Sequence, residues 1–140
     1  MEKRIYDFLA KNHLMSLATY GSGGIWAASC FYRFDPVDLA LVFASDETTM
    51  HMRHIASNPK VAGTIAPCEL KINNIQGVQF QGEVYRAKPR QRRLYCEAFP
   101  IAKAIPSNFW SVELFRVKMT DNTLGFKTKR IWTRTGPDDR

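Results

Sequence analysis

The sequence predicts a mainly β domain that folds as a closed or split β-barrel with a few short helices. About seven short apolar or alternating runs are separated by turn residues, which is the spacing of an all-β architecture. Gly77 and Gly82 interrupt the longest alternating run and indicate the bulges or tight curvature that a barrel requires. The 140 residues contain no repeat, low-complexity tract or linker. We therefore expect one domain over residues 1–134 and a disordered tail over residues 135–140.

The first half of the chain alternates strands with two helices. Ile5, Phe8 and Leu9 have helical spacing and predict an amphipathic helix at the start. Both faces of residues 25–34 are apolar, so we expect that strand to lie in the centre of the sheet. The expected elements are a helix over residues 3–11, strands over 14–20, 25–34 and 39–45, a helix that ends before Pro59, and a strand over 61–66.

The second half is dominated by two long strands. Val78, Phe80 and Val84 alternate with polar residues, which predicts a strand with one buried and one exposed face. The expected elements are a strand over residues 75–87, a helix over 90–99, a loop over 100–106, a strand over 109–119, a turn over 120–123 and a last strand over 124–133.

The stretch between the third strand and Pro59 carries the most functional information. It places hydroxyl groups at the start of a helix that directly follows a buried strand. The first N–H groups of a helix lack internal partners and its dipole favours anions, and Arg53 adds a fixed positive charge. The stretch therefore predicts a phosphate-binding site that includes Ser45, Thr48, Thr49 and Arg53.

A second interpretation of this stretch needs no ligand. Hydroxyl and acidic residues are ordinary N-caps, and Asp46 and Glu47 complement the helix dipole by themselves. Two carboxylates would also repel a phosphate. Residue chemistry alone leaves both interpretations open.

The charge of the chain is unevenly distributed. Residues 1–70 carry 6 basic and 7 acidic side chains, whereas residues 71–140 carry 14 and 6, and the net charge is +7. A basic half predicts an anionic partner, either a phosphorylated small molecule or nucleic acid. Arg90, Arg92 and Arg93 would carry the nucleic-acid interpretation. Because no nucleic-acid motif accompanies them, a solvated helix face is the better explanation, and we do not expect nucleic acid as the partner.

Composition also bears on compartment and metals. No run approaches the roughly 20 apolar residues of a membrane span, so no membrane partner is expected. The first residues show no secretion signal, so we expect a cytoplasmic protein. The cysteines Cys30, Cys68 and Cys96 are widely spaced and form no metal pattern with the three histidines. We interpret them as reduced thiols and expect no metal site.

The order of elements and several local motifs resemble the pyridoxamine-phosphate oxidase-like, FMN-binding split-barrel superfamily, in particular its small bacterial branch. In that family the helix after the third strand holds the flavin phosphate. Here Thr49 stands in place of a serine, Met50 in place of an arginine and His51 in place of a lysine. His51 can still donate to a phosphate, with pH dependence. The resemblance thus implies phosphate contacts from Ser45, Thr48, Thr49, His51 and Arg53.

Two other segments correspond to parts of the family's cofactor site. The family lays the backbone of its second strand along the flavin ring, which corresponds here to Trp26, Ala27, Ala28 and Ser29. Across the family's dimer interface a polar side chain of the partner approaches the cofactor, which corresponds to Gln79. Judged without the resemblance, these are small core residues and a solvated strand face, respectively.

The last strand departs from the family's substrate-binding motif Arg-Leu-His-Asp-Arg. Arg130 and Arg134 keep both arginines, whereas Trp132 and Thr133 replace the histidine and the aspartate. Leu124 stands where the family has a flavin-contacting tryptophan. The resemblance therefore does not extend to vitamin B6 oxidation. Arg130 and Trp132 are still candidates to cap a flat anionic ligand.

The leading functional hypothesis is a homodimeric FMN-binding split barrel with the cofactor at the dimer interface. It would be an oxidoreductase on an unidentified small molecule, with the flavin doing the chemistry. The alternative is a non-catalytic binding module for haem or another anionic ligand, with His51 and His54 offered as haem ligands.

Overall fold

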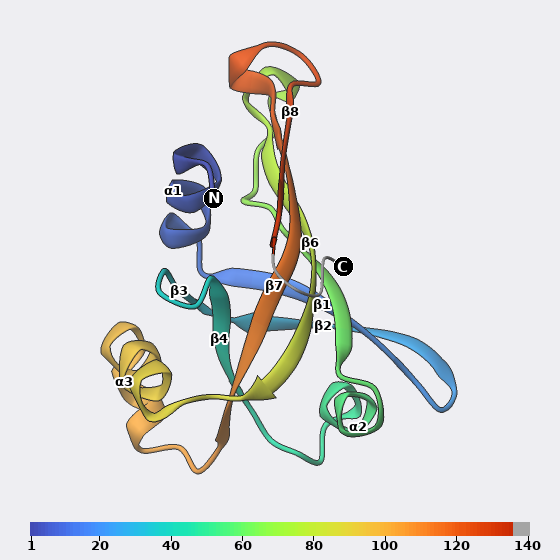
Figure 1. Ribbon diagram of the computed structural model, residues 1–140, viewed down its shortest axis with the longest axis vertical. Coiled ribbons are helices and arrows are strands. Elements are labelled where there is room, and N and C mark those ends of the chain that lie inside the picture. Colours follow the sequence, from blue (N-terminus) through green and yellow to red (C-terminus); the bar gives the residue numbers. More distant parts are fainter. Residues whose placement is uncertain (136–140) are drawn as a thin grey trace.

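Residues 1–135 are described by a computed structural model, and residues 136–140, which make up most of the expected tail, lie outside the described residues. Eight antiparallel strands form one curled sheet with short helices around it (Figure 1). The predicted split-barrel fold is confirmed. No helix within residues 1–135 is long and apolar enough to cross a membrane.

The order of the elements along the chain agrees with the expectation from sequence. The elements are α1 (Lys3–Lys11), β1 (Leu14–Gly21), β2 (Gly24–Phe31), β3 (Arg33–Asp35), β4 (Ala40–Ser45), α2 (Met50–Ser57), β5 (Lys60–Ile65), β6 (Gln76–Arg86), α3 (Pro89–Ala98), β7 (Asn108–Asp121) and β8 (Lys129–Thr133), with 3₁₀ turns at Ile72–Asn74, Pro100–Lys103 and Asn122–Leu124. In the sheet the strands follow the order β2, β1, β5, β6, β7, β4, β3, and β8 pairs with β7.

The second strand lies at an end of the sheet, so its expected central position was wrong. Within residues 1–135, β2 pairs with β1 alone. One face of β2 is apolar because it faces the core, but the other face leaves Ile25 76% and Phe31 58% exposed. An edge strand with exposed apolar side chains is a surface that usually needs a cover.

Tyr32 interrupts the strand that was expected over residues 25–34. Its hydroxyl donates to the carbonyl oxygen of Leu9 at 2.9 Å, and its N–H donates to the carbonyl oxygen of His13 at 2.8 Å. The side chain is fully buried. These contacts turn the chain toward the end of α1, so β2 and β3 are separate strands.

The last strand is shorter than expected because a turn precedes it. Gly125 and Lys127 have φ angles of 121° and 63°, in the region that extended strands do not occupy. Pairing between β7 and β8 therefore begins only at Lys129.

Gly82 produces the bulge that its position predicted. The register between β6 and β7 shifts between Gln81 and Gly82. A Cβ atom at Gly82 would lie 2.4 Å from the carbonyl oxygen of Glu113, so only glycine allows this close approach. At Gly77 the pairing between β6 and β7 is regular, so no bulge forms there, and tight curvature at this glycine stays a prediction.

The main core lies between the sheet and two of the helices. Ile5, Phe8 and Leu9 from α1 and Met52 and Ile55 from α2 join the inward side chains of the strands in one buried cluster. Helix α3 covers a second, smaller cluster formed by Val42, Tyr95, Cys96, Ala102 and Phe109.

Strand register defines the opposite, outward face of the sheet. Directly paired residues share a face, and two rows of outward residues cross the strands side by side. One row is Ser29, Ser16, Thr64, Gln79, Lys118 and Ile131, and the other is Ala27, Ala18, Ala62, Gln81, Arg116 and Thr133.

A buried carboxylate ties the start of the chain to the end of β7. Asp121 accepts hydrogen bonds from Arg4 Nη1 at 2.9 Å, from Gln76 Nε2 at 3.3 Å and from the N–H of Thr123 at 3.0 Å. Burial raises the pKa of Asp121, but the hydrogen bonds from Thr123, Gln76 and Arg4 outweigh it, so the pKa lies below its ordinary value. Asp121 is therefore ionised at neutral pH.

Candidate functional site

The hydroxyl groups at the start of α2 are engaged in local hydrogen bonds. Thr49 is the N-cap: its Oγ1 accepts from the N–H of Met52 at 3.3 Å and donates to the carbonyl oxygen of Asp46 at 2.9 Å. The carboxylate of Asp46 accepts from both the N–H and the hydroxyl of Thr48 at 2.7 Å. These two bonds hold the pKa of Asp46 below its ordinary value. An ionised carboxylate therefore lies where the sequence predicted a phosphate.

His51 and Ser45 form a second local pair. His51 Nε2 lies 2.7 Å from Ser45 Oγ and 3.3 Å from Thr49 Oγ1. Burial lowers the pKa of His51, so the ring is neutral at pH 7 and carries no charge toward an anion.

Arg53 is the cation at this helix that is left for a ligand. It is exposed, and its guanidinium lies 4.0 Å from the sulfur of Met50. No ion pair involves Arg53 within the described chain. The fit of this helix start to a phosphate thus rests on Arg53 and the helix N–H groups.

His54 is a core residue that fastens α2 to β1. Its Nδ1 lies 3.0 Å from the hydroxyl of Thr19, and its Nε2 is buried without a hydrogen-bond partner among residues 1–135. The ring packs against Gly21, where a Cβ atom would be 2.5 Å from the ring. His54 is enclosed in the core, so its unpaired Nε2 is not accessible to a haem iron, and the Nε2 of His51 is bonded to Ser45.

The predicted ring-binding segment is accessible. Trp26 is 49% exposed, and Ala27 and Ser29 lie on the outward face, to which Gln79 also belongs. Ser29 and Gln79 are three strands apart in one row, which is roughly 14 Å at the usual strand spacing. Within one chain, Gln79 is therefore too far from Ser29 for both side chains to contact the same small group of a ligand.

Arg130 and Trp132 lie on the other face of the sheet. They pair with the buried residues Met119 and Val117, and so they point inward. Arg130 forms an ion pair with Glu2 at 2.7 Å.

Trp26 and Ala28 pair with the buried Thr19 and Leu17, so they lie on the inward face of β2. Within one chain the structure therefore separates the predicted site residues into four groups: the start of α2, the outward sheet face, the inward face of β2 and the inward side of β8.

The remaining chemistry-bearing groups have structural surroundings. Cys30 and Cys96 are buried, and burial raises the pKa of Cys30 to about 11, which suppresses its thiolate. Among the described residues no group of three or more histidine, cysteine, aspartate or glutamate side chains could hold a metal. Arg90 forms a bidentate pair with the buried Asp35 at 2.9 Å, so it anchors α3. This role of Arg90 supports the interpretation of the basic face of α3 as a structural, solvated helix face and not as a nucleic-acid site.

Sequence reasoning overlooked one cavity, which lies beside α1 and is lined by Arg4, Phe8, Lys11 and Arg130 among others. Its signal in the sequence is the spacing of Arg4, Phe8 and Lys11, which places these three side chains on one side of a helix. The sequence analysis used Ile5, Phe8 and Leu9 to predict an amphipathic helix and gave no role to Arg4 or Lys11.

The chain is similar over nearly its whole length to two bacterial proteins. It is 41% identical over 138 residues to a UPF0306 protein of Serratia proteamaculans, with 96% of each chain covered. It is 40% identical over 134 residues to a UPF0306 protein of Photorhabdus laumondii, covering 93% of this chain and 94% of that one. No family model matches the chain.

Solved structures share the fold at low identity. A haem-binding protein from Mycobacterium smegmatis superposes with a TM-score of 0.73 at 21% identity, over 89% of this chain and 54% of that one. An FAD-binding protein from Mesorhizobium loti gives 0.71 at 14% identity, over 85% and 93%. The haem storage protein HutZ from Vibrio cholerae gives 0.66 at 12% identity, over 81% and 89%. These similarities establish the split-barrel fold.

Proposed function

Since this chain belongs to the UPF0306 family and has the split-barrel fold, we propose that it is a small-molecule-binding protein that holds FMN between two copies of itself. Split barrels named for binding FAD or haem support a planar anionic ligand. FMN is the specific choice because the resemblance of the α2 and β2 segments is to the flavin site.

The outward sheet face is the observation that carries this proposal. Ala27, Ala18 and Ala62 lie side by side across three strands, and none of them is fully buried. Small side chains let a flat ring approach the backbone closely.

Large apolar side chains flank the small ones and favour a second copy of the chain as the cover. Leu14 pairs with Phe31 and Tyr20 pairs with Ile25 on the same face, and each of the four is at least half exposed. An exposed apolar face of this kind is typical of an interface between subunits. The partner's Gln79 would then approach a ring that lies over β1 and β2.

In this proposal Arg53 and the N–H groups of α2 hold the phosphate, with Thr48, Thr49 and a neutral His51 beside it. The backbone of Trp26, Ala27, Ala28 and Ser29 runs along the ring. The flavin, when bound, would supply oxidoreductase chemistry, and the chain would orient it and exclude water. The role of Arg130 and Trp132 as a cap stays a prediction, because they lie on the inward side of β8.

The test is a titration of the purified protein with FMN, FAD and haem, followed by absorption and fluorescence. We expect FMN to bind, and Arg53→Ala to weaken it about tenfold, the usual effect of losing one charge-assisted hydrogen bond. Arg93→Ala removes another exposed arginine, from α3, and is the matched control. Absence of flavin binding, or equal affinities of the two variants, would contradict the proposal.

Haem binding is the second candidate, and one residue favours it. Of the three histidines, His13 alone has neither ring nitrogen hydrogen-bonded within residues 1–135 while it is exposed. Its ring meets Phe99 edge-on at 6.2 Å, and Phe99 in turn contacts the exposed Phe31. If haem binds, we expect His13→Ala to abolish the shift of the Soret band, whereas His51→Ala should leave it unchanged.

A further inference from the structure

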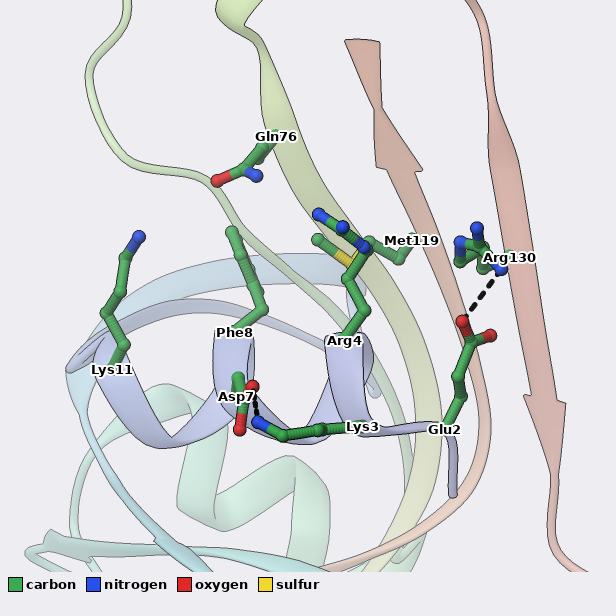
Figure 2. A pocket seen from close by; sticks show the side chains of 9 residues that line it. All are labelled: Glu2, Lys3, Arg4, Asp7, Phe8, Lys11, Gln76, Met119 and Arg130. Atoms are coloured by element: carbon green, nitrogen blue, oxygen red, sulfur yellow. Dashed lines mark hydrogen bonds and ion pairs between the residues drawn. The ribbon is translucent and has the colours of Figure 1, made fainter. Parts of the chain in front are cut away.

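A cavity of about 590 Å³ lies between α1 and the strands β6, β7 and β8 (Figure 2). Its size is within the range of small-molecule sites in proteins. The residues that line it are Glu2, Lys3, Arg4, Asp7, Phe8, Lys11, Gln76, Met119 and Arg130.

The cavity is separate from the outward face proposed for the cofactor. Met119 is 1% exposed and points inward, and Arg130 is its partner across the β7–β8 ladder. Gln79 lies on the opposite side of the sheet. A ligand in this cavity would therefore contact a different set of side chains.

Positive charge dominates the cavity. Four of the lining side chains are cationic and two are carboxylates. Lys3 and Asp7 pair with each other, on the other side of α1 from Gln76 in Figure 2. Arg4 is held by the buried Asp121 through Nη1, which positions its guanidinium at the wall.

Arg130 and Lys11 lack partners for part of their charge. Arg130 pairs with Glu2 through Nη1, but its Nε is buried and has no hydrogen-bond acceptor among the described residues. An unsatisfied buried donor on a charged group is costly, and an anion at the exposed end of this guanidinium would offset part of that cost. Lys11 forms no ion pair within residues 1–135.

The side of α1 that faces the cavity sets the spacing of its cations and provides an apolar part of its lining. Arg4, Phe8 and Lys11 follow one another along the helix, and Arg4 and Lys11 are about 10 Å apart along its axis. Phe8 and Met119 are buried and apolar. The cavity thus has cations toward both ends and an apolar surface between them.

From this arrangement we propose that the cavity binds a small organic dianion, either a phosphate monoester or a dicarboxylate. An acidic group accepts from the guanidinium groups of Arg130 and Arg4, the carbon skeleton lies over Phe8 and Met119, and Lys11 balances the remaining charge. The carboxylate of Glu2 forms an ion pair with Arg130 in the structure, and it therefore competes with the ligand for this guanidinium. This site does not depend on the proposed cofactor function.

The experiment is calorimetric titration of the full-length protein with ribose 5-phosphate and with succinate. We expect one of the two to bind, and the identity of the binder separates the phosphate monoester from the dicarboxylate. Arg130→Gln should weaken binding about tenfold, and Lys11→Gln about threefold. Glu2→Gln should tighten binding about threefold, because it frees Arg130. Lys103→Gln, an exposed lysine remote from the cavity lining, is the charge-matched control.

Three outcomes would overturn the proposal. The first is no binding of either probe at about 10 mM, which is weaker than a metabolite site requires. The second is equal weakening by Lys11→Gln and Lys103→Gln, which would indicate unspecific attraction to a basic protein. The third is loss of probe binding when FMN saturates the protein, which would place the probe in the cofactor site. Unchanged melting temperatures of Arg130→Gln and Lys11→Gln establish that the variants are folded.

Discussion

The start of α2 and the cavity beside α1 both combine a helix with polar and charged side chains, but they differ in what is left over. At α2, the N–H and the hydroxyl of Thr48 both donate to Asp46, and Ser45 Oγ is hydrogen-bonded to His51. Beside α1, the cations outnumber the carboxylates, and a buried N–H of Arg130 has no acceptor within the described chain. Residue types suggested several ligand contacts at α2, of which the partners leave mainly Arg53, whereas beside α1 the partners leave more than one cation for a ligand. A hydrogen-bond donor can bind a ligand only if no neighbouring acceptor already uses it, and a sequence motif does not show whether that is so.

Removal of Asp121 should disturb the α1 side most. Asp121→Ala deletes the buried acceptor of Arg4, Gln76 and Thr123. We expect a loss of roughly 2 to 3 kcal/mol in the free energy of unfolding, below the value for a fully buried pair because the Arg4 side chain is 41% exposed. Urea denaturation measures it, and a change under about 0.5 kcal/mol would show that α1 is held by apolar contacts alone.

The same carboxylate makes a prediction about pH. The folded-state pKa of Asp121 is depressed, so its contribution is complete above the unfolded pKa near 4 and is lost as pH falls through the folded value. The difference in stability between the wild type and Asp121→Ala should therefore shrink below about pH 4.

On the α2 side, the attachment to β1 can be broken at Gly21. Gly21→Ala would place a methyl group 2.5 Å from the His54 ring. Overpacking of this kind costs about 2 kcal/mol. The double variant Gly21→Ala/His54→Ala provides the control in thermal unfolding: if the methyl group acts through the ring, its cost should largely vanish when the ring is absent.

Loss of the Thr49 cap should have a smaller effect. Thr49→Ala leaves the N–H of Met52 without its acceptor and should lower stability by about 1 kcal/mol. Thr49→Ser keeps the hydroxyl and should restore most of it. If the threonine serves a phosphate more than the helix, Thr49→Ala would instead leave the stability of the ligand-free protein unchanged.

The smallest effect concerns His51. Because burial depresses its folded-state pKa, the unfolded state binds a proton first, and stability should decline slightly as pH falls below about 6.5. His51→Gln should flatten this slope in denaturation curves between about pH 7 and 5. A steeper slope in the variant would mean that another group titrates there.

The types and order of the elements could be predicted because they depend on local periodicity. The helical spacing of Ile5, Phe8 and Leu9 predicts a helix, and the alternation of apolar and polar residues around Phe80 predicts a strand, without knowledge of any tertiary contact. The edge position of β2 could not be predicted, because apolar residues on two faces are equally consistent with a central strand and with an uncovered interface. Local chemistry does not distinguish burial by the sheet from burial by a second chain.

The candidate sites were less accessible to sequence reasoning. The bond between Ser45 and His51 depends on how the chain leaves β4, which no short pattern encodes. The cavity beside α1 depends on Arg130 meeting Glu2 across almost the whole length of the chain. Both are products of long-range geometry, whereas the motif resemblance concerned neighbours in sequence.

Asp121 has a consequence for the dynamics of the molecule. One carboxylate serves donors from α1, from the start of β6 and from the turn after β7, which are far apart in the chain. When the end of β7 opens, α1, the start of β6 and the turn after β7 lose this acceptor at the same time, so we expect the three to open together when that strand end does. Amide hydrogens in α1 and at the far end of the β6–β7 pair should therefore exchange with solvent together. The helix that closes the cavity is thereby coupled to the far end of the longest strands in the fold.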